Sequence, residues 1–185
     1  MSHLTPSRVL ASSTLKFLEQ NPSLCDSLIE DCNYNLHEVS TIVQPVLDAS
    51  KRCKVSPFYI QGVTTGRTSF LVTKLVLNQR PEIATVDSSW SIGRSLTCSI
   101  VVQDRSVSRC HAVIGHHHLD GFYIADVGSS NGTWVNQRKL TLMERRVICD
   151  NDLIQLGSIK AEFFVTCRPR AIDSEGDTVG IQITL

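Results

Sequence analysis

The sequence predicts a mainly β protein, a two-sheet β-sandwich preceded by a small helical N-terminal extension. Three observations support this prediction. The chain has 185 residues, 42% of them hydrophobic, and from about residue 68 onward short apolar segments alternate with turn residues. That length accommodates one ordinary domain with an appendage, and that apolar fraction is sufficient for a hydrophobic core. Many short strands separated by frequent turns are typical of a sandwich or a barrel.

The predicted domain plan has four parts, which follow from changes in periodicity along the chain. The apolar spacing is helical at first, turn formers then interrupt it, and strand-like segments follow. Over residues 179–185 apolar and polar residues alternate, which predicts one further strand that pairs with an open edge of the sandwich or with another molecule. The four parts are a helical N-terminal extension (1–56), a linker (57–67), the β domain (68–168) and a C-terminal tail (169–185).

Two helices are predicted within the N-terminal extension. Ser23 can cap a short helix over 24–32. A second, amphipathic helix contains Pro45, which predicts either a kink or a helix that starts near this residue, because proline removes one backbone hydrogen bond. The apolar stripe of this second helix consists of Val39, Ile42, Val43, Val46 and Leu47.

Ten strands are predicted in the β domain, each a short apolar segment bounded by turn residues. They are Phe70–Leu77, Glu82–Val86, Ser89–Ile92, Ile100–Val102, His111–Gly115, Phe122–Asp126, Thr133–Val135, Arg146–Ile148, Leu153–Leu156 and Ala161–Val165.

Composition excludes several classes of protein. Eighteen basic and eighteen acidic residues cancel, so the chain lacks the overall basic field expected of a nucleic-acid-binding protein. No run of about 18 apolar residues predicts a membrane span. The seven cysteines are scattered without a C-x-x-C pair, which favours reduced thiols and a cytoplasmic location. The first residues lack acids and carry Arg8 and Lys16, a weak similarity to a transit peptide.

Three predicted loops carry the polar residues that a ligand site needs. Their side chains offer guanidinium forks, hydroxyl donors and an amide, the groups that bind the oxygens of a phosphorylated serine or threonine. Glycines let the backbone turn tightly and approach a ligand closely. The same composition is also common in ordinary turns. The loops are Ser91–Ser95, Val107–His111 and Asp126–Thr133, and the groups in question belong to Arg94, Ser108, Arg109, Ser130 and Asn131, with Gly128 and Gly132.

These loops, in this order and spacing, resemble the forkhead-associated (FHA) domain. The pieces that carry the resemblance are G-R at 93–94, S-R-x-H at 108–111 and S-S-N-G-T at 129–133. The segments 100–108, 126–136 and 152–157 are also similar to the family's strands. This sequence departs from the family pattern at two positions, because Gln137 and Asn151 stand where many family members have glycine. Glutamine adopts the left-handed conformation less readily, so the hairpin at Gln137 is expected to differ in shape.

The resemblance implies a two-sheet sandwich that binds phosphothreonine peptides through loops at one end. By position, Arg94 and Ser108 would contact the phosphate, and Arg109 would add a second charged contact or a backbone contact to the peptide. Ser130 and Asn131 would hold the peptide main chain. The remaining residues would support the site structurally: Gly93 by shaping its turn, His111 by bracing the loop of Ser108, and Gly132.

The function that follows is a signalling adaptor downstream of a Ser/Thr protein kinase, without cofactor or metal. Its partner would be a phosphothreonine-containing protein, with a Ser/Thr kinase or its substrate as candidates. The alternative is a degenerate FHA scaffold that mediates phospho-independent interaction or dimerisation through the helical extension. Self-binding is a further hypothesis, with five threonines outside the sandwich as candidate phosphorylation sites: Thr5, Thr14, Thr41, Thr64 and Thr65.

Catalysis and metal binding find little support in the sequence. It contains no P-loop, no H-E-x-x-H and no G-x-S-x-G motif. Three successive histidines, His116 to His118, precede a predicted turn. Successive residues of a strand point to opposite faces, so three in a row cannot all reach one ion. An exposed polar loop is therefore the interpretation favoured for them.

Overall fold

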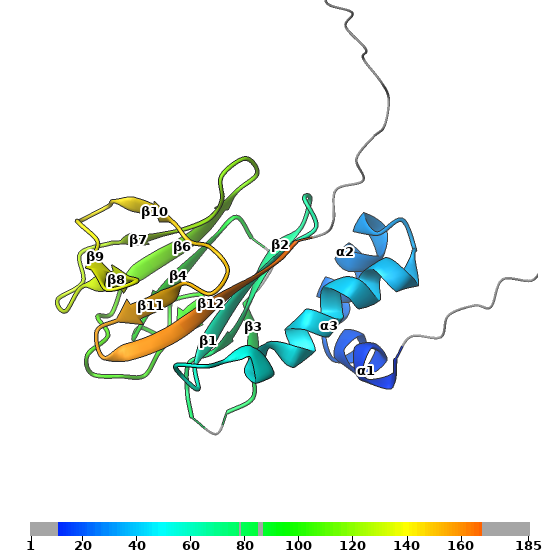
Figure 1. Ribbon diagram of the computed structural model, residues 1–185, viewed down its shortest axis with the longest axis horizontal. Coiled ribbons are helices and arrows are strands. Elements are labelled where there is room, and N and C mark those ends of the chain that lie inside the picture. Colours follow the sequence, from blue (N-terminus) through cyan, green and yellow to red (C-terminus); the bar gives the residue numbers. More distant parts are fainter. Residues whose placement is uncertain (1–10, 78, 85–86, 168–185) are drawn as a thin grey trace, which may run out of the picture.

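The computed structural model describes residues 11–77, 79–84 and 87–167. Helices come first and strands follow, as Figure 1 shows. The helices are α1 (Ser12–Gln20), α2 (Pro22–Asp31) and α3 (Leu36–Arg52). The first strands are β1 (Tyr59–Thr64), β2 (Ser69–Lys74), β3 (Glu82–Ala84), β4 (Ser89–Gly93), β5 (Ile100–Val101) and β6 (Ala112–His117). The remaining strands are β7 (Gly121–Asp126), β8 (Thr133–Val135), β9 (Arg138–Lys139), β10 (Arg145–Val147), β11 (Leu153–Leu156) and β12 (Ile159–Cys167).

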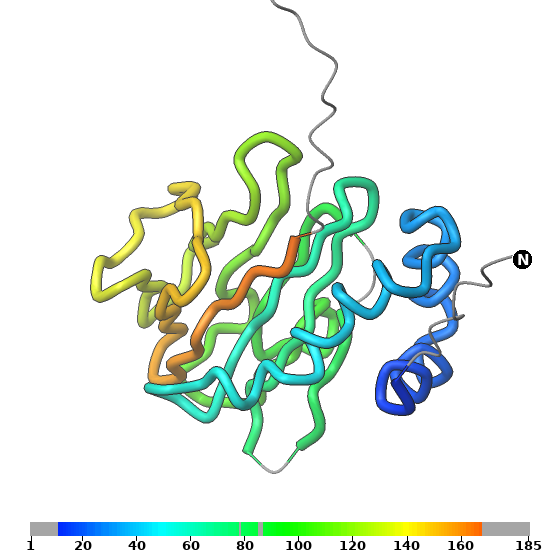
Figure 2. The backbone as a smooth tube through the Cα atoms, turned by 45° about the vertical axis from the view of Figure 1, so that its right-hand side comes forward, coloured from blue at the N-terminus to red at the C-terminus, as the bar shows by residue number. Residues whose placement is uncertain are grey.

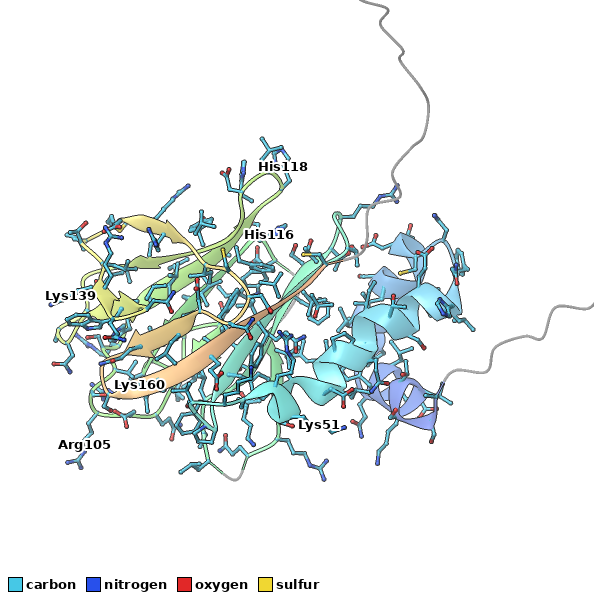
Figure 3. The ribbon with its side chains drawn as sticks, viewed as in Figure 1. Lys51, Arg105, His116, His118, Lys139 and Lys160 are labelled. Atoms are coloured by element: carbon cyan, nitrogen blue, oxygen red, sulfur yellow. The ribbon has the colours of Figure 1, made fainter. Side chains whose placement is uncertain are left out.

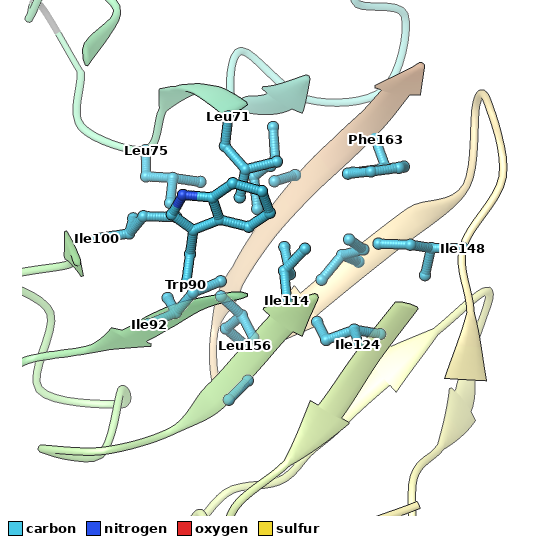
Figure 4. Close-up of a cluster of buried hydrophobic side chains, with 14 of the residues drawn as sticks. Leu71, Leu75, Trp90, Ile92, Ile100, Ile114, Ile124, Ile148, Leu156 and Phe163 are labelled. Atoms are coloured by element: carbon cyan, nitrogen blue, oxygen red, sulfur yellow. The ribbon is translucent and has the colours of Figure 1, made fainter. Parts of the chain in front are cut away.

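The strands form two mixed sheets that pack face to face, as predicted for a sandwich. The larger sheet has seven strands in the order β3-β2-β1-β12-β11-β8-β9, and the smaller has five in the order β10-β7-β6-β4-β5. Pairing is antiparallel except between β1 and β12 and between β4 and β5. Apolar side chains from both sheets meet in one core, with Trp90, Ile114 and Phe163 fully buried at its centre (Figure 4).

The three helices cover the outer face of the larger sheet, on the side away from the smaller one (Figure 2). Val39, Ile42 and Val43 of α3 belong to a second apolar cluster, together with Phe70 of β2 and Phe164 of β12. The central strands of the larger sheet are therefore buried on both faces, which explains why exposed and buried residues do not alternate along β1 and β2. The apolar stripe of the predicted amphipathic helix is covered by this chain's own sandwich.

The linker predicted over 57–67 is wrong, because β1 occupies most of it. This strand lies between β2 and β12, with Gly62 opposite Leu71 and Val165. The side chain of Gln61 is fully buried and its Nε2 donates to Thr166 Oγ1 at 2.8 Å. Glycine, glutamine and threonine resemble loop residues in sequence, but a strand buried on both faces can hold them when a neighbouring strand supplies partners.

Helix α3 runs without a break from Leu36 to Arg52, so it does not start at Pro45. Its N-cap is Asn35, whose side chain accepts hydrogen bonds from the backbone N–H groups of His37 and Glu38. Burial of the apolar stripe against the sheet outweighs the roughly 3 kcal/mol that an internal proline costs a helix. Ser23 does not cap α2, which begins one residue earlier with Pro22 at its first position.

Strand β9 is not among the predicted strands, because its two exposed residues carry no apolar signal. The strand predicted over 179–185 and the residues of the transit-like segment before residue 11 lie outside the described residues. No helix in the described ranges is long and apolar enough to cross a bilayer.

Candidate functional site

The loops that follow β4 and precede β6 are joined by backbone hydrogen bonds. The N–H of Arg94 donates to Ser108 O at 2.9 Å and the N–H of Ser95 donates to Arg109 O at 3.1 Å. At the base of the same loops, the N–H of His111 donates to Ile92 O at 2.9 Å. The structure therefore places Arg94 beside Ser108 and Arg109, although 14 or more positions separate them in sequence.

Ser108 also connects this pair of loops to the third one. Its Oγ accepts a hydrogen bond from the Ser130 N–H at 3.0 Å and lies 3.4 Å from Ser130 Oγ. The first bond fixes the position of the Ser108 oxygen. The second is at the long limit of a hydrogen bond, so the Ser108 proton can turn toward a ligand that offers a stronger acceptor.

His111 is fully buried between the loop that carries Ser108 and the loop that carries Gly132, and its ring forms hydrogen bonds to both. Its Nδ1 accepts from the Ser108 N–H at 3.0 Å, and its Nε2 lies 3.2 Å from Gly132 O. Because Nδ1 is an acceptor, the ring proton resides on Nε2, which donates to Gly132. Burial lowers the pKa of His111, against the opposing effects of Gly132 O and Asp126. The ring is therefore a neutral brace.

Asp126 organises the loop between β7 and β8. One carboxylate oxygen accepts from the N–H groups of Gly128 and Ser129, both at 2.9 Å. The other accepts from the hydroxyls of Ser129 and Thr133. Burial acts to raise the pKa of Asp126, but these four hydrogen bonds outweigh it and hold the pKa at about 2. Asp126 belongs to the third of the loop motifs, and its role depends on these contacts, which only the folded loop creates.

Asn131 lies at the exposed tip of the same loop. Its Nδ2 donates to Ser106 O at 2.8 Å, which ties the tip to the loop between β5 and β6. Within the described ranges, no hydrogen bond uses its Oδ1, so this oxygen is available to accept from a peptide N–H.

Cationic side chains surround this end of the sandwich. Arg94 is exposed and its Nε donates to Val107 O at 3.3 Å. Within the described part of the chain, its terminal nitrogens and the whole guanidinium of Arg109 have no hydrogen-bond or ion-pair partner. Lys139 and Arg105 lie at the same end, far from the helices (Figure 3). Lys139 belongs to strand β9, which the apolar pattern does not predict.

Two glycines of the site have a steric requirement. A methyl group at Gly93 would lie 2.2 Å from Arg109 O and 2.9 Å from Cys98 Sγ, too close for either to remain in place. Gly132 has a φ of +85°, in the region that favours glycine, and a methyl group there would lie 2.5 Å from Lys139 Cε. The absence of a side chain at Gly93 lets the loops that follow β4 and precede β6 approach each other, whereas Gly132 is required for its backbone conformation.

The three histidines lie at the other end of strand β6. His116 is half-buried, with Nδ1 3.0 Å from Ser69 Oγ and its ring 4.6 Å from that of Phe122. The prediction of an exposed polar loop is therefore wrong for His116, which packs as part of the strand, whereas His117 and His118 are exposed. In the described ranges no group of three potential metal ligands is present.

The candidate phosphorylation sites are mostly inaccessible. Thr14 and Thr64 are buried, and Thr65 donates its hydroxyl proton to Asp31. Thr41 is exposed on α3, and Thr5 lies outside the described residues. Of the described candidates, Thr41 alone presents an exposed side chain to a kinase.

Comparisons with known proteins identify the family to which these loops belong. The sequence profile of the FHA domain family matches residues 90–157, which include all three loops. The Glycogen accumulation regulator GarA of Mycolicibacterium smegmatis is 31% identical over 117 residues, covering 62% of this chain and 68% of that protein. Germ layers disorganized gldi-3 of Caenorhabditis elegans is 30% identical over 86 residues, and this chain spans only 9% of its length. The solved FHA domain of CT664 protein from Chlamydia trachomatis is 28% identical, with a TM-score of 0.43 and coverage of 49% of this chain and 91% of that one.

The fold and the site define a two-sheet β-sandwich that presents three interlocked polar loops at one end. The family profile and the relationship to GarA establish which sandwich family this is: the chain belongs to the forkhead-associated domain family.

Proposed function

We propose that this protein binds phosphothreonine peptides at the loop end of the sandwich and acts as a signalling adaptor downstream of a Ser/Thr protein kinase. The observation that carries the proposal is the network of Ser108, His111, Ser130 and Gly132. This network fixes two loops together and leaves the guanidinium groups of Arg94 and Arg109 beside them.

The phosphate would be held by Arg94 and Ser108. A phosphothreonine carries about 1.5 to 2 negative charges at neutral pH and three acceptor oxygens. The Arg94 guanidinium offers terminal N–H donors for two of these oxygens, and the fixed hydroxyl of Ser108 can donate to a third. Arg109, exposed on the same loop, adds a second positive charge, and no hydrogen bond or ion pair in the described residues has to break first.

The peptide main chain would lie against the loop between β7 and β8. Asn131 is anchored through Nδ2 to Ser106 O, so its Oδ1 is held ready to accept from a peptide N–H. Ser130 has an exposed hydroxyl beside the phosphate position. Because Asp126 and His111 fix this loop before any ligand arrives, little ordering entropy is lost on binding.

The relatives support an adaptor role and not a catalytic one. GarA is named as a regulator of glycogen accumulation, and an oxoglutarate dehydrogenase inhibitor of Corynebacterium jeikeium is 28% identical over 63% of this chain. Both names describe proteins that control others. The alternative, dimerisation through the apolar face of the helical extension, is not favoured because α3 buries that face against β1, β2 and β12.

The proposal is tested with an oriented peptide library in three versions, carrying phosphothreonine, phosphoserine or threonine at the fixed position. We expect capture of the phosphothreonine library with defined preferences at the flanking positions. Equal capture of all three libraries, or capture of none, would overturn the proposal.

A further inference from the structure

Two cysteines meet directly behind the loop that carries Ser108 and Arg109. The thiol of Cys98 donates to Arg109 O at 3.3 Å, and the N–H of Cys98 donates to Ser95 O at 3.1 Å. Cys98 Sγ therefore lies 3.3 Å from the carbonyl oxygen of the residue that directly precedes Cys110. This proximity to the backbone of residues 109 and 110 lets a turn of the Cys110 side chain bring the two sulfur atoms together without a large backbone movement.

The two thiols differ in their access to solvent. Cys98 is 8% exposed, packed against Gly93 and the Arg109 carbonyl. Cys110 is exposed on the loop surface. Burial raises the pKa of Cys98, and contact with Cys110 raises it further. An oxidant therefore reaches Cys110 first, and Cys98 stands behind it as a protected thiol.

We propose that Cys98 and Cys110 are a reversible oxidative modification site, at which a hydroperoxide converts the two thiols into one disulfide. The sulfur of Cys110 attacks a peroxide oxygen, the O–O bond breaks, and a sulfenic acid and one water form. The sulfur of Cys98 then attacks the sulfenic sulfur, the S–O bond breaks, and hydroxide leaves with the Cys98 proton as a second water. Two thiols lose two electrons in total, and one hydrogen peroxide is reduced to two waters.

The disulfide would alter the phosphopeptide site, a consequence that rests on the function proposed above. Oxidation removes the S–H group that donates to Arg109 O and pulls Cys110 inward. Arg109 O is also the acceptor for the Ser95 N–H, and Ser108 O for the Arg94 N–H. A shift of residues 108–110 therefore moves Ser108 and Arg109 relative to Arg94, and the affinity for phosphate falls.

The modification is tested by peptide mapping of the full chain after a limiting dose of hydrogen peroxide and alkylation of the remaining thiols. Trypsin cuts after Arg94, Arg105, Arg109 and Arg138, so Cys98 and Cys110 fall in separate peptides, 95–105 and 110–138. We expect these two peptides to be joined, and to separate after reduction by dithiothreitol. If Cys110 is oxidised only to sulfenic or sulfinic acid, or is linked to another cysteine instead, the proposal is wrong.

Variants separate this pair from the other thiols. Cys110→Ser should abolish the linked peptides, whereas Cys149→Ser, a control at another exposed cysteine, should leave them intact. In the same preparations, a library-selected phosphothreonine peptide should bind the oxidised protein about tenfold more weakly than the reduced one, a change equal to the loss of about one hydrogen bond to a charged group. Unchanged affinity in fully linked protein would overturn the coupling to the site. Failure of the reduced protein to bind would instead count against the proposed function, because the mapping does not depend on it.

Discussion

Replacing His111 by alanine should destabilise the protein strongly and weaken phosphopeptide binding at the same time. The substitution removes the acceptor of the Ser108 N–H and the donor to Gly132 O. Each group left unsatisfied costs about 1 to 3 kcal/mol, and the emptied ring volume adds a cavity cost. We therefore expect a loss of about 3 to 5 kcal/mol, a large share of the roughly 5 to 15 kcal/mol that holds an ordinary domain folded.

His111→Asn provides a graded comparison. The asparagine oxygen can replace Nδ1 as the acceptor of the Ser108 N–H, but its shorter side chain does not reach Gly132 O. About half of the alanine effect is therefore expected. Urea denaturation of the parent and both variants at pH 7.5 measures the difference in the free energy of unfolding. If His111→Ala lies within about 0.5 kcal/mol of the parent, as an ordinary surface substitution would, the bracing role of the ring is refuted.

The same residue predicts a pH dependence. Burial lowers the pKa of His111 in the folded protein, so as the pH falls below the unfolded value of about 6.5 the unfolded chain takes up a proton that the fold excludes. The contribution of His111 is complete above that pH and is lost as the pH falls toward the folded pKa. Between pH 7.5 and 5, stability should therefore decrease less steeply in His111→Asn than in the parent. Identical slopes would contradict a neutral, buried ring.

Three further substitutions test the scaffold of the site. Gly93→Ala should weaken phosphopeptide binding at least tenfold, because its methyl group would displace the carbonyl of Arg109; unchanged affinity by titration calorimetry would contradict this. Asp126→Asn should lower the free energy of unfolding by about 2 kcal/mol at pH 7, because the fold lowers the carboxyl pKa from 3.8 to about 2. The parent should lose the same stability as the pH falls from about 4 to 2, where this carboxylate becomes protonated. Gln137→Gly should raise stability by roughly 0.5 to 1 kcal/mol, because Gln137 has a φ of 69° that glycine adopts without cost; a lower melting temperature would argue against strain there.

Most of the candidate site residues could be predicted from the local sequence, whereas fewer of the surrounding elements could. The three loops are short motifs with characteristic spacing, so Arg94, Ser108 and Asn131 could be singled out without a structure. Their grouping at one end depends on strand order, which the resemblance to FHA domains supplied. Their assigned roles remain predictions that the variants above test.

The features that could not be predicted from the sequence depend on tertiary contacts. Strand β1 has no alternating pattern because it is buried on both faces, and Gly62 and Gln61 give it the composition of a loop. The hairpin between β8 and β9 was expected to differ in shape, and this expectation is wrong: Asn136 and Gln137 both have positive φ angles and form the tight two-residue turn that is common in hairpins. Cys98 lies beside the carbonyl of Arg109 because the folded sheet brings their two loops together.

Phosphate binding by Arg94 is tested most directly by comparing Arg94→Ala with the parent in titration calorimetry against a library-selected phosphothreonine peptide. Arg67→Ala, which removes an exposed arginine beside His116 at the other end of the sandwich, is the matched control. We expect at least a tenfold loss of affinity for Arg94→Ala and full affinity for Arg67→Ala. Both variants should melt at temperatures close to that of the parent, because an exposed arginine contributes little to the core. Full affinity in Arg94→Ala would show that phosphate binds elsewhere or not at all.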